Sequence, residues 1–156
     1  MAKEIAGKVH LGRDGFGERR SLGISFISFK LISKDKDGLF ILENEFHAKD
    51  GPAKHLHHSQ DEWFYCLEGS FLVKVGDESI TLEPGDSVLA PRNIPHVWAY
   101  IGEKVGRILV AFTPAGKMEA FFREVTKLNA MPAQDPGLWS AHGMELLGPP
   151  IFDFTG

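Results

Sequence analysis

The chain has 156 residues, of which 43% are hydrophobic and 24% are charged, and these values exclude a disordered polypeptide and predict one globular domain over residues 1–156. Its net charge is −4 and its longest basic cluster is Arg19-Arg20, which excludes a nucleic-acid-binding protein as a class. A single cysteine, Cys66, allows no internal disulfide, and no apolar run reaches the length of a signal peptide or a membrane span, so we expect a cytoplasmic protein with no membrane partner.

Most of the chain up to residue 113 predicts short strands. Residues 1–20 are polar and rich in glycine, and we expect an irregular N-terminal arm there. Residues 21–33 alternate in hydrophobicity, with Leu22, Ile24 and Phe26 followed, after a slip, by Phe29 and Leu31. Further apolar runs between turn residues predict strands at 39–47, 54–58, 62–67, 71–75, 79–82, 87–90, 96–101 and 107–113. Many short strands with frequent turns are typical of an all-β fold, an antiparallel sandwich or barrel.

The chain changes character after residue 113. Residues 117–128 are good helix formers, and the spacing of their apolar side chains predicts a C-terminal helix that packs outside the barrel. A proline-rich tail follows, and its apolar segment 146–152 is expected to fold over the barrel as a lid or to contact a second copy of the chain. We therefore expect one domain with a barrel core at about residues 22–113.

The residues that carry chemistry lie between positions 51 and 100. His55 and His57 are two apart on a predicted strand, so both imidazoles face the same side, whereas His58 faces the other. Glu62 opens the next strand and would sit beside them if the two strands were antiparallel neighbours. His96 opens a later strand. On spacing alone a metal site and a set of hydrogen-bonded core histidines both remain open.

Three imidazoles and one carboxylate fit a divalent transition metal, which is Fe, Mn, Ni, Co, Cu or Zn, and do not fit Mg or Ca, which prefer oxygen ligands. Such a set leaves coordination positions free for a substrate or dioxygen, as catalytic metals require. A structural zinc site is disfavoured because these sites are usually rich in cysteine.

Two segments resemble the motifs of the cupin superfamily. GPAKHLHHSQDEWFYCLEG at 51–69 is similar to its first motif, HxHxxxxE followed by six residues and then Gly, and GDSVLAPRNIPH at 85–96 is similar to its second. The resemblance implies a jelly-roll β-barrel in which His55, His57, Glu62 and His96 bind one metal near a mouth. Asn93 departs from the usual glycine but tolerates a left-handed turn. Tyr100 stands where asparagine is often found, which affects the shape of the pocket and not the metal ligands.

Within the superfamily the chain most resembles small single-domain cupins similar to quercetin 2,3-dioxygenase. That resemblance implies a metal-dependent dioxygenase acting on an enol or phenolic, quercetin-like small molecule, with Glu62 as the catalytic base. A metal-dependent isomerase or lyase of a keto or enol acid is the alternative enzyme, and a non-enzymatic small-molecule-binding cupin is the third possibility.

Strand parity places four side chains on the same inward face as the metal ligands, and we expect them to line the substrate pocket: Phe64, Cys66, Trp98 and Tyr100. They could equally be fillers of the barrel core, and this is the expected role of Cys66. The resemblance also implies a homodimer, because strand exchange is common in cupins. The strand at 21–33 has an edge that needs covering, either by a second copy or within the chain.

Overall fold

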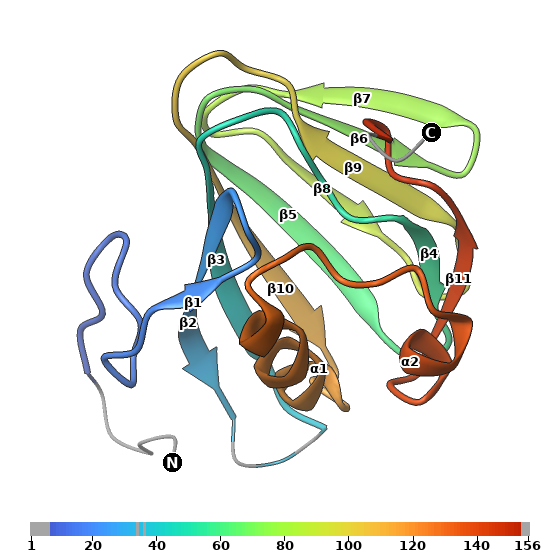
Figure 1. Cartoon of the computed structure of the whole chain (residues 1–156), viewed down its shortest axis with the longest axis horizontal. Coiled ribbons are helices and arrows are strands. Elements are labelled where there is room, and N and C mark those ends of the chain that lie inside the picture. The colour runs from blue at the N-terminus through green and yellow to red at the C-terminus, as the bar shows by residue number, and fades with distance from the viewer. Residues whose placement is uncertain (1–6, 34, 36, 154–156) are drawn as a thin grey trace.

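Two antiparallel sheets face each other in the computed structural model, which describes residues 7–33, 35 and 37–153 (Figure 1). The first sheet has the strand order β1 (Arg20–Ser21), β2 (Ser25–Ile32), β3 (Phe40–Phe46), β10 (Gly106–Thr113), β5 (Asp61–Glu68) and β8 (Ser87–Ala90). The second has the order β11 (Met144–Gly148), β4 (Lys54–His57), β9 (His96–Tyr100), β6 (Phe71–Val75) and β7 (Glu78–Leu82). The predicted all-β jelly-roll fold is confirmed, and each predicted strand overlaps one of β2 to β10.

The core fills the space between the sheets with large apolar side chains that alternate along each strand. In β5, for example, Glu62, Phe64 and Cys66 are buried while Trp63 is partly exposed on the other face. The largest fully buried aromatic side chains include Phe29, Phe40, Phe46, Phe64, Phe71, Tyr100, Phe112 and Trp139. Burial of this apolar area is the main force that holds the two sheets together.

Strand β2 was predicted, but the apolar pattern of residues 21–33 matches the buried side chains only in part, at Leu22 and Phe29. Ser25, Ile27 and Phe29 are the buried residues, whereas Ile24 and Leu31 are exposed. The pairing with β3 shifts register between Phe29 and Leu31, which is a β-bulge, and it interrupts the simple alternation. Because β2 pairs with β3 and β1 of the same chain, its neighbours are supplied within the chain.

The predicted helix is confirmed as α1 (Met118–Val125) followed by the short 3₁₀ helix η1 (Thr126–Leu128). Its buried residues Met118, Phe121 and Val125 belong to the main core. The tail beyond it is more ordered than the sequence predicts. It forms a short helix, α2 (Pro136–Ser140), whose first turn is capped by the Asp135 side chain, and then strand β11, which pairs with β4.

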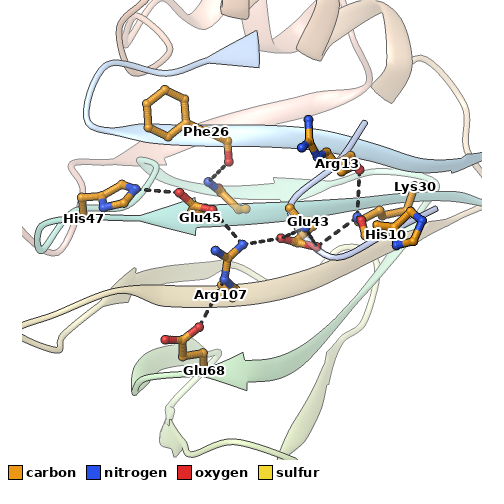
Figure 2. A network of polar contacts seen from close by, with 11 residues as sticks. His10, Arg13, Phe26, Lys30, Glu43, Glu45, His47, Glu68 and Arg107 are labelled. Carbon is orange, nitrogen blue, oxygen red and sulfur yellow. Dashed lines mark hydrogen bonds and ion pairs between the residues drawn. The ribbon is translucent and has the colours of Figure 1, made fainter. Parts of the chain in front are cut away.

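The N-terminal arm is irregular, as predicted, over the described residues 7–19. It lies on the outer face of the first sheet, where a row of charges crosses four strands (Figure 2). Glu43 is almost completely buried there, and its carboxylate contacts Lys30 Nζ at 3.1 Å, Arg107 Nη1 at 2.9 Å and the Gly12 backbone N–H at 3.1 Å. These contacts attach the arm to the sheet. Among the described residues, no helix is long and apolar enough to cross a membrane.

Candidate metal centre

The four predicted ligands meet inside the barrel, and they reach it from both sheets. His55 and His57 lie on β4 and His96 begins β9, and His55 and His96 stand directly opposite each other in the β4–β9 pair. Glu62 lies on β5, in the other sheet. Strands β4 and β5 are therefore not paired neighbours. The turn after His57 carries the chain from one sheet to the other, so Glu62 faces the histidines across the interior.

All four side chains are buried, and their ligand atoms lie within 4.8 Å of one another. Glu62 Oε1 is 2.9 Å from Nε2 of His57, 2.9 Å from Nε2 of His96 and 3.9 Å from Nε2 of His55. This separation is what one ion bound by all four groups requires, since each ligand atom then lies about 2 Å from the ion.

The hydrogen bonds of the imidazoles show which nitrogen faces the centre. Nδ1 of His55 donates to Ala53 O at 2.7 Å, Nδ1 of His96 to Ile94 O at 3.3 Å, and Nδ1 of His57 to Gln60 Oε1 at 2.9 Å. An oxygen of this kind can only accept, so Nδ1 carries the hydrogen on each ring. Nε2 is therefore the nitrogen of each ring that faces the Glu62 carboxylate. Because Nε2 of His57 and Nε2 of His96 each lie 2.9 Å from Glu62 Oε1, either a proton on the ring or a metal ion has to lie between nitrogen and oxygen. The residues therefore fit a metal ion.

Electrostatics in this buried cluster agree with a cation site. Burial by itself would raise the pKa of Glu62, but the charge of His96 and the hydrogen bonds with His57 and His96 hold that pKa well below its ordinary range. Burial, followed by the neighbouring His96 and His57, lowers the pKa of His55 well below 6.5. Glu62 is thus ionised and His55 neutral near pH 7, the forms in which both groups bind metals.

Next to the cluster lies a small cavity of about 40 Å³, which we call the metal chamber. Its walls come from the barrel and from the C-terminal part of the chain. Trp98, Val110 and Phe112 belong to the strands, whereas the others come from the helices, β11 and loops: Pro52, Met118, Phe121, Phe122, Pro132, Trp139 and Met144. The indole of Trp139 packs 4.8 Å from the His55 ring, measured between ring centroids. Side chains of α1 and α2 form part of the chamber's largely apolar wall.

Comparison with known proteins identifies the fold family. Residues 44–112 match the family model described as "Cupin domain", and this range includes all four clustered residues. Residues 44–112 thus correspond to a cupin domain.

A curated relative of this cupin domain is quercetin 2,3-dioxygenase of Bacillus subtilis, which is 32% identical over 110 residues. The match covers 70% of this chain but only 32% of the relative, so the chain spans about a third of that protein's length. Among solved structures, KdgF from Halomonas sp. is 20% identical with a TM-score of 0.58, covering 70% of this chain and 94% of its own. An RmlC-like cupin from Shewanella frigidimarina is 21% identical with a TM-score of 0.57, covering 73% and 96%. These two likenesses concern the fold.

Of the four side chains predicted to line a substrate pocket, Trp98 borders the metal chamber of the cupin domain. Phe64 packs on the rings of His96 and Trp98, and Tyr100 packs on Phe46 and Phe71, deeper in the core. Cys66 is fully buried; its thiol donates to Gly69 O, and burial raises its pKa to about 11. A contact between these residues and a substrate stays a prediction.

Two further expectations about this region are confirmed. Asn93 has a φ of 65°, the left-handed conformation that glycine usually supplies, and its backbone N–H donates to His57 O at 2.7 Å. His58 points away from the centre, where its ring lies 3.6 Å from the Glu145 carboxylate and is half exposed.

Gln60 and Trp139 lie at the centre but were not predicted from the sequence. Gln60 was placed in a turn, yet it is buried and orients His57. A buried polar residue inside the first motif was the available signal for Gln60. No signal pointed to Trp139, because its approach to His55 depends on how the tail folds back.

Proposed function

We propose that this cupin domain binds one divalent transition metal through His55, His57, Glu62 and His96 and acts as a dioxygenase on an enol or phenolic small molecule. The observation that supports the proposal is the convergence of three imidazole Nε2 atoms and one carboxylate beside a largely apolar chamber. The distant similarity to quercetin 2,3-dioxygenase supports the oxygen chemistry. Homodimer formation and a cytoplasmic location stay predictions.

The bound metal would supply a Lewis acid for the substrate oxygen and a binding position for dioxygen. The protein residues would orient the ligands, limit access of water and accept a proton. The Nδ1 hydrogen bonds hold the three rings in place, and the apolar walls from α1 and α2 keep bulk water out. Glu62 is the ionised group nearest the chamber, so it is the group that can take the proton of an enol or phenol. Because its pKa is held low among the histidines, Glu62 has to leave them to act as a base.

The first experiment is elemental analysis of protein purified without a histidine tag. We expect about one transition metal per chain in the parent and in His58→Ala, and loss of most of it in the double variant His55→Ala/His96→Ala. His58→Ala is the matched control because His58 is the neighbouring histidine that points outward. Equal metal in the double variant would contradict the site.

The second experiment measures oxygen uptake by the metal-loaded protein with flavonols and catechols. Uptake that matches substrate loss, and that the double variant lacks, supports the dioxygenase. Substrate loss without oxygen uptake would instead favour an isomerase or lyase, and tight binding without turnover would favour a non-enzymatic binding protein.

A further inference from the structure

A second, larger cavity lies beside the metal chamber, and we call it the vestibule. It measures about 410 Å³ and is formed by residues 50–53 before β4, residues 131–134 between η1 and α2, and residues 150–153 after β11, without residue 151. Figure 1 shows the chain running from α1 to α2 and on through β11, the part of the chain that supplies two of these three segments. Pro52 and Pro132 border both cavities, so these two prolines form the partition between them.

The two volumes decide what each compartment can hold. A bound water needs at least ~10–15 Å³ of such space, so a chamber of about 40 Å³ accepts a few atoms beside the metal, such as dioxygen or one oxygen-bearing group. Drug-sized ligands occupy cavities of roughly 300–1,000 Å³, and the vestibule falls in that range. A ring-bearing substrate therefore fits the vestibule and does not fit the chamber.

We propose that the vestibule binds the body of the substrate and that only one small oxygen-bearing group passes between Pro52 and Pro132 to the metal chamber. This inference rests on the proposed function, and it names the class of substrate: a flat, neutral ring compound that carries hydroxyl groups.

The lining of the vestibule sets this class. Met131, Pro132, Pro150 and Phe152 supply an apolar surface for a ring. Asp50 adds a carboxylate that accepts one hydrogen bond from the Gly51 N–H at 2.8 Å and has further capacity to accept from a hydroxyl. Asp153 is a second acidic residue of the wall. The Asp50 carboxylate repels a ligand whose body is itself anionic.

Close packing holds Pro52 on one side of the partition, and a hydrogen bond from Trp139 holds the chain beside Pro132 on the other. A Cβ atom on Gly51 would lie 2.0 Å from Trp98 O, so the chain before Pro52 is pressed against β9 and only glycine fits there. On the other side, Trp139 Nε1 donates to Ala133 O at 2.8 Å, next to Pro132, while its indole packs on His55. Trp139 thus couples the position of Pro132 to the ligand set and is a positioning residue for the passage.

The test uses the Co²⁺-loaded protein and follows ligand binding in its visible spectrum. Three probes are compared: azide, which fits the chamber, neutral 2,3-dihydroxynaphthalene, and the same ring carrying a 6-sulfonate. We expect Met131→Trp, which fills the vestibule, to lower the affinity for the neutral probe at least about tenfold, while the affinity for azide changes by less than about twofold. Leu147→Trp is the matched control, because Leu147 is exposed on β11 outside the vestibule, and it should leave all three affinities unchanged.

A second variant tests the charge. The parent should bind the neutral ring at least about tenfold more tightly than the sulfonate, and Asp50→Asn should reduce this preference at least about threefold. If Met131→Trp fails to fold, Met131→Phe takes its place, and retained azide binding reports an intact centre. If Met131→Trp bound dihydroxynaphthalene and azide as tightly as the parent, the vestibule would not be the binding site of the ring. The proposed metal site would be unaffected by that result. Failure of Co²⁺ to bind at all would overturn the proposed function as well.

Discussion

Gln60 joins three parts of the molecule through one amide group. Its Oε1 accepts the hydrogen of His57 Nδ1, and its Nε2 donates to Pro114 O at 2.9 Å and to Ala115 O at 2.6 Å. The two carbonyl acceptors fix which end of the amide is nitrogen, and this in turn fixes the His57 ring. Gln60 thereby orients a ligand without adding a charge to the buried centre.

We expect Gln60→Ala to weaken metal binding about 10- to 100-fold, because removing a partner that orients a ligating histidine typically costs this much. Affinity is measured by competition with a chromophoric chelator. Ser59→Ala changes the exposed neighbour in the same turn and should have no effect. An affinity for Gln60→Ala within about twofold of the parent would show that His57 needs no such support.

At this scale the sequence predicts the ligands better than their surroundings. His55, His57, Glu62 and His96 sit in two motifs with short internal spacing, so their convergence could be predicted. Parity also places Phe64, Cys66 and Tyr100 correctly on the inner face, but it does not tell how deep along the barrel each one lies. The depth of a side chain depends on how the strands of the two sheets are staggered. The position of Trp139 beside His55 depends on how the C-terminal tail folds back.

Among the structural elements, the N-terminal arm depends most on a single side chain. Asp14 accepts hydrogen bonds from the Phe29 N–H and from Phe16 N–H, both at 2.8 Å, and its carboxylate pairs with Arg20 Nε at 3.0 Å. Burial alone would raise the pKa of Asp14, but the Phe29 N–H, Arg20 and the Phe16 N–H together hold it below its ordinary range. The arm is thus attached to β2 by a carboxylate that must be ionised.

This attachment predicts a pH-dependent stability. A group whose pKa is lower in the folded state stabilises the fold above its ordinary pKa, near 4, and loses that contribution as the pH falls through its folded value. We expect Asp14→Asn to lower the free energy of unfolding by about 1–3 kcal/mol at neutral pH, and the difference from the parent to shrink toward pH ~3. Urea unfolding at several pH values measures it, with the exposed Asp77→Asn as control. A difference that does not change with pH would contradict the role of the charge.

The tail shows which elements sequence patterns miss. Strand β11 has only five residues, and the prolines at 132, 136, 149 and 150 suggest irregular structure. Its order arises from contacts far away in sequence: β11 pairs with the edge of β4, placing Met144 opposite His57. Helix α1, in contrast, was predictable because its apolar residues follow a helical period by themselves.

For the whole molecule, the metal centre is also a link between the two sheets. His55, His57 and His96 belong to one sheet and Glu62 to the other, so one bound ion would hold both together. Without a metal, the buried carboxylate depends on protons on the histidines, and burial opposes charge on His55. Metal binding should therefore stabilise the fold as well as serve chemistry.

We expect the melting temperature to rise when metal is added to the metal-free protein. At a free metal concentration of about 100 times the dissociation constant, binding contributes about 2.7 kcal/mol, which corresponds to a rise of about 5–10 °C for a chain of this size. Differential scanning calorimetry measures the rise, which His58→Ala should keep and His55→Ala/His96→Ala should lose. An equal rise in the double variant would mean that the ion binds elsewhere, for example at the pair formed by the half-exposed His47 and Glu45 on the outer face of the first sheet. The buried cluster would then be a hydrogen-bonded core.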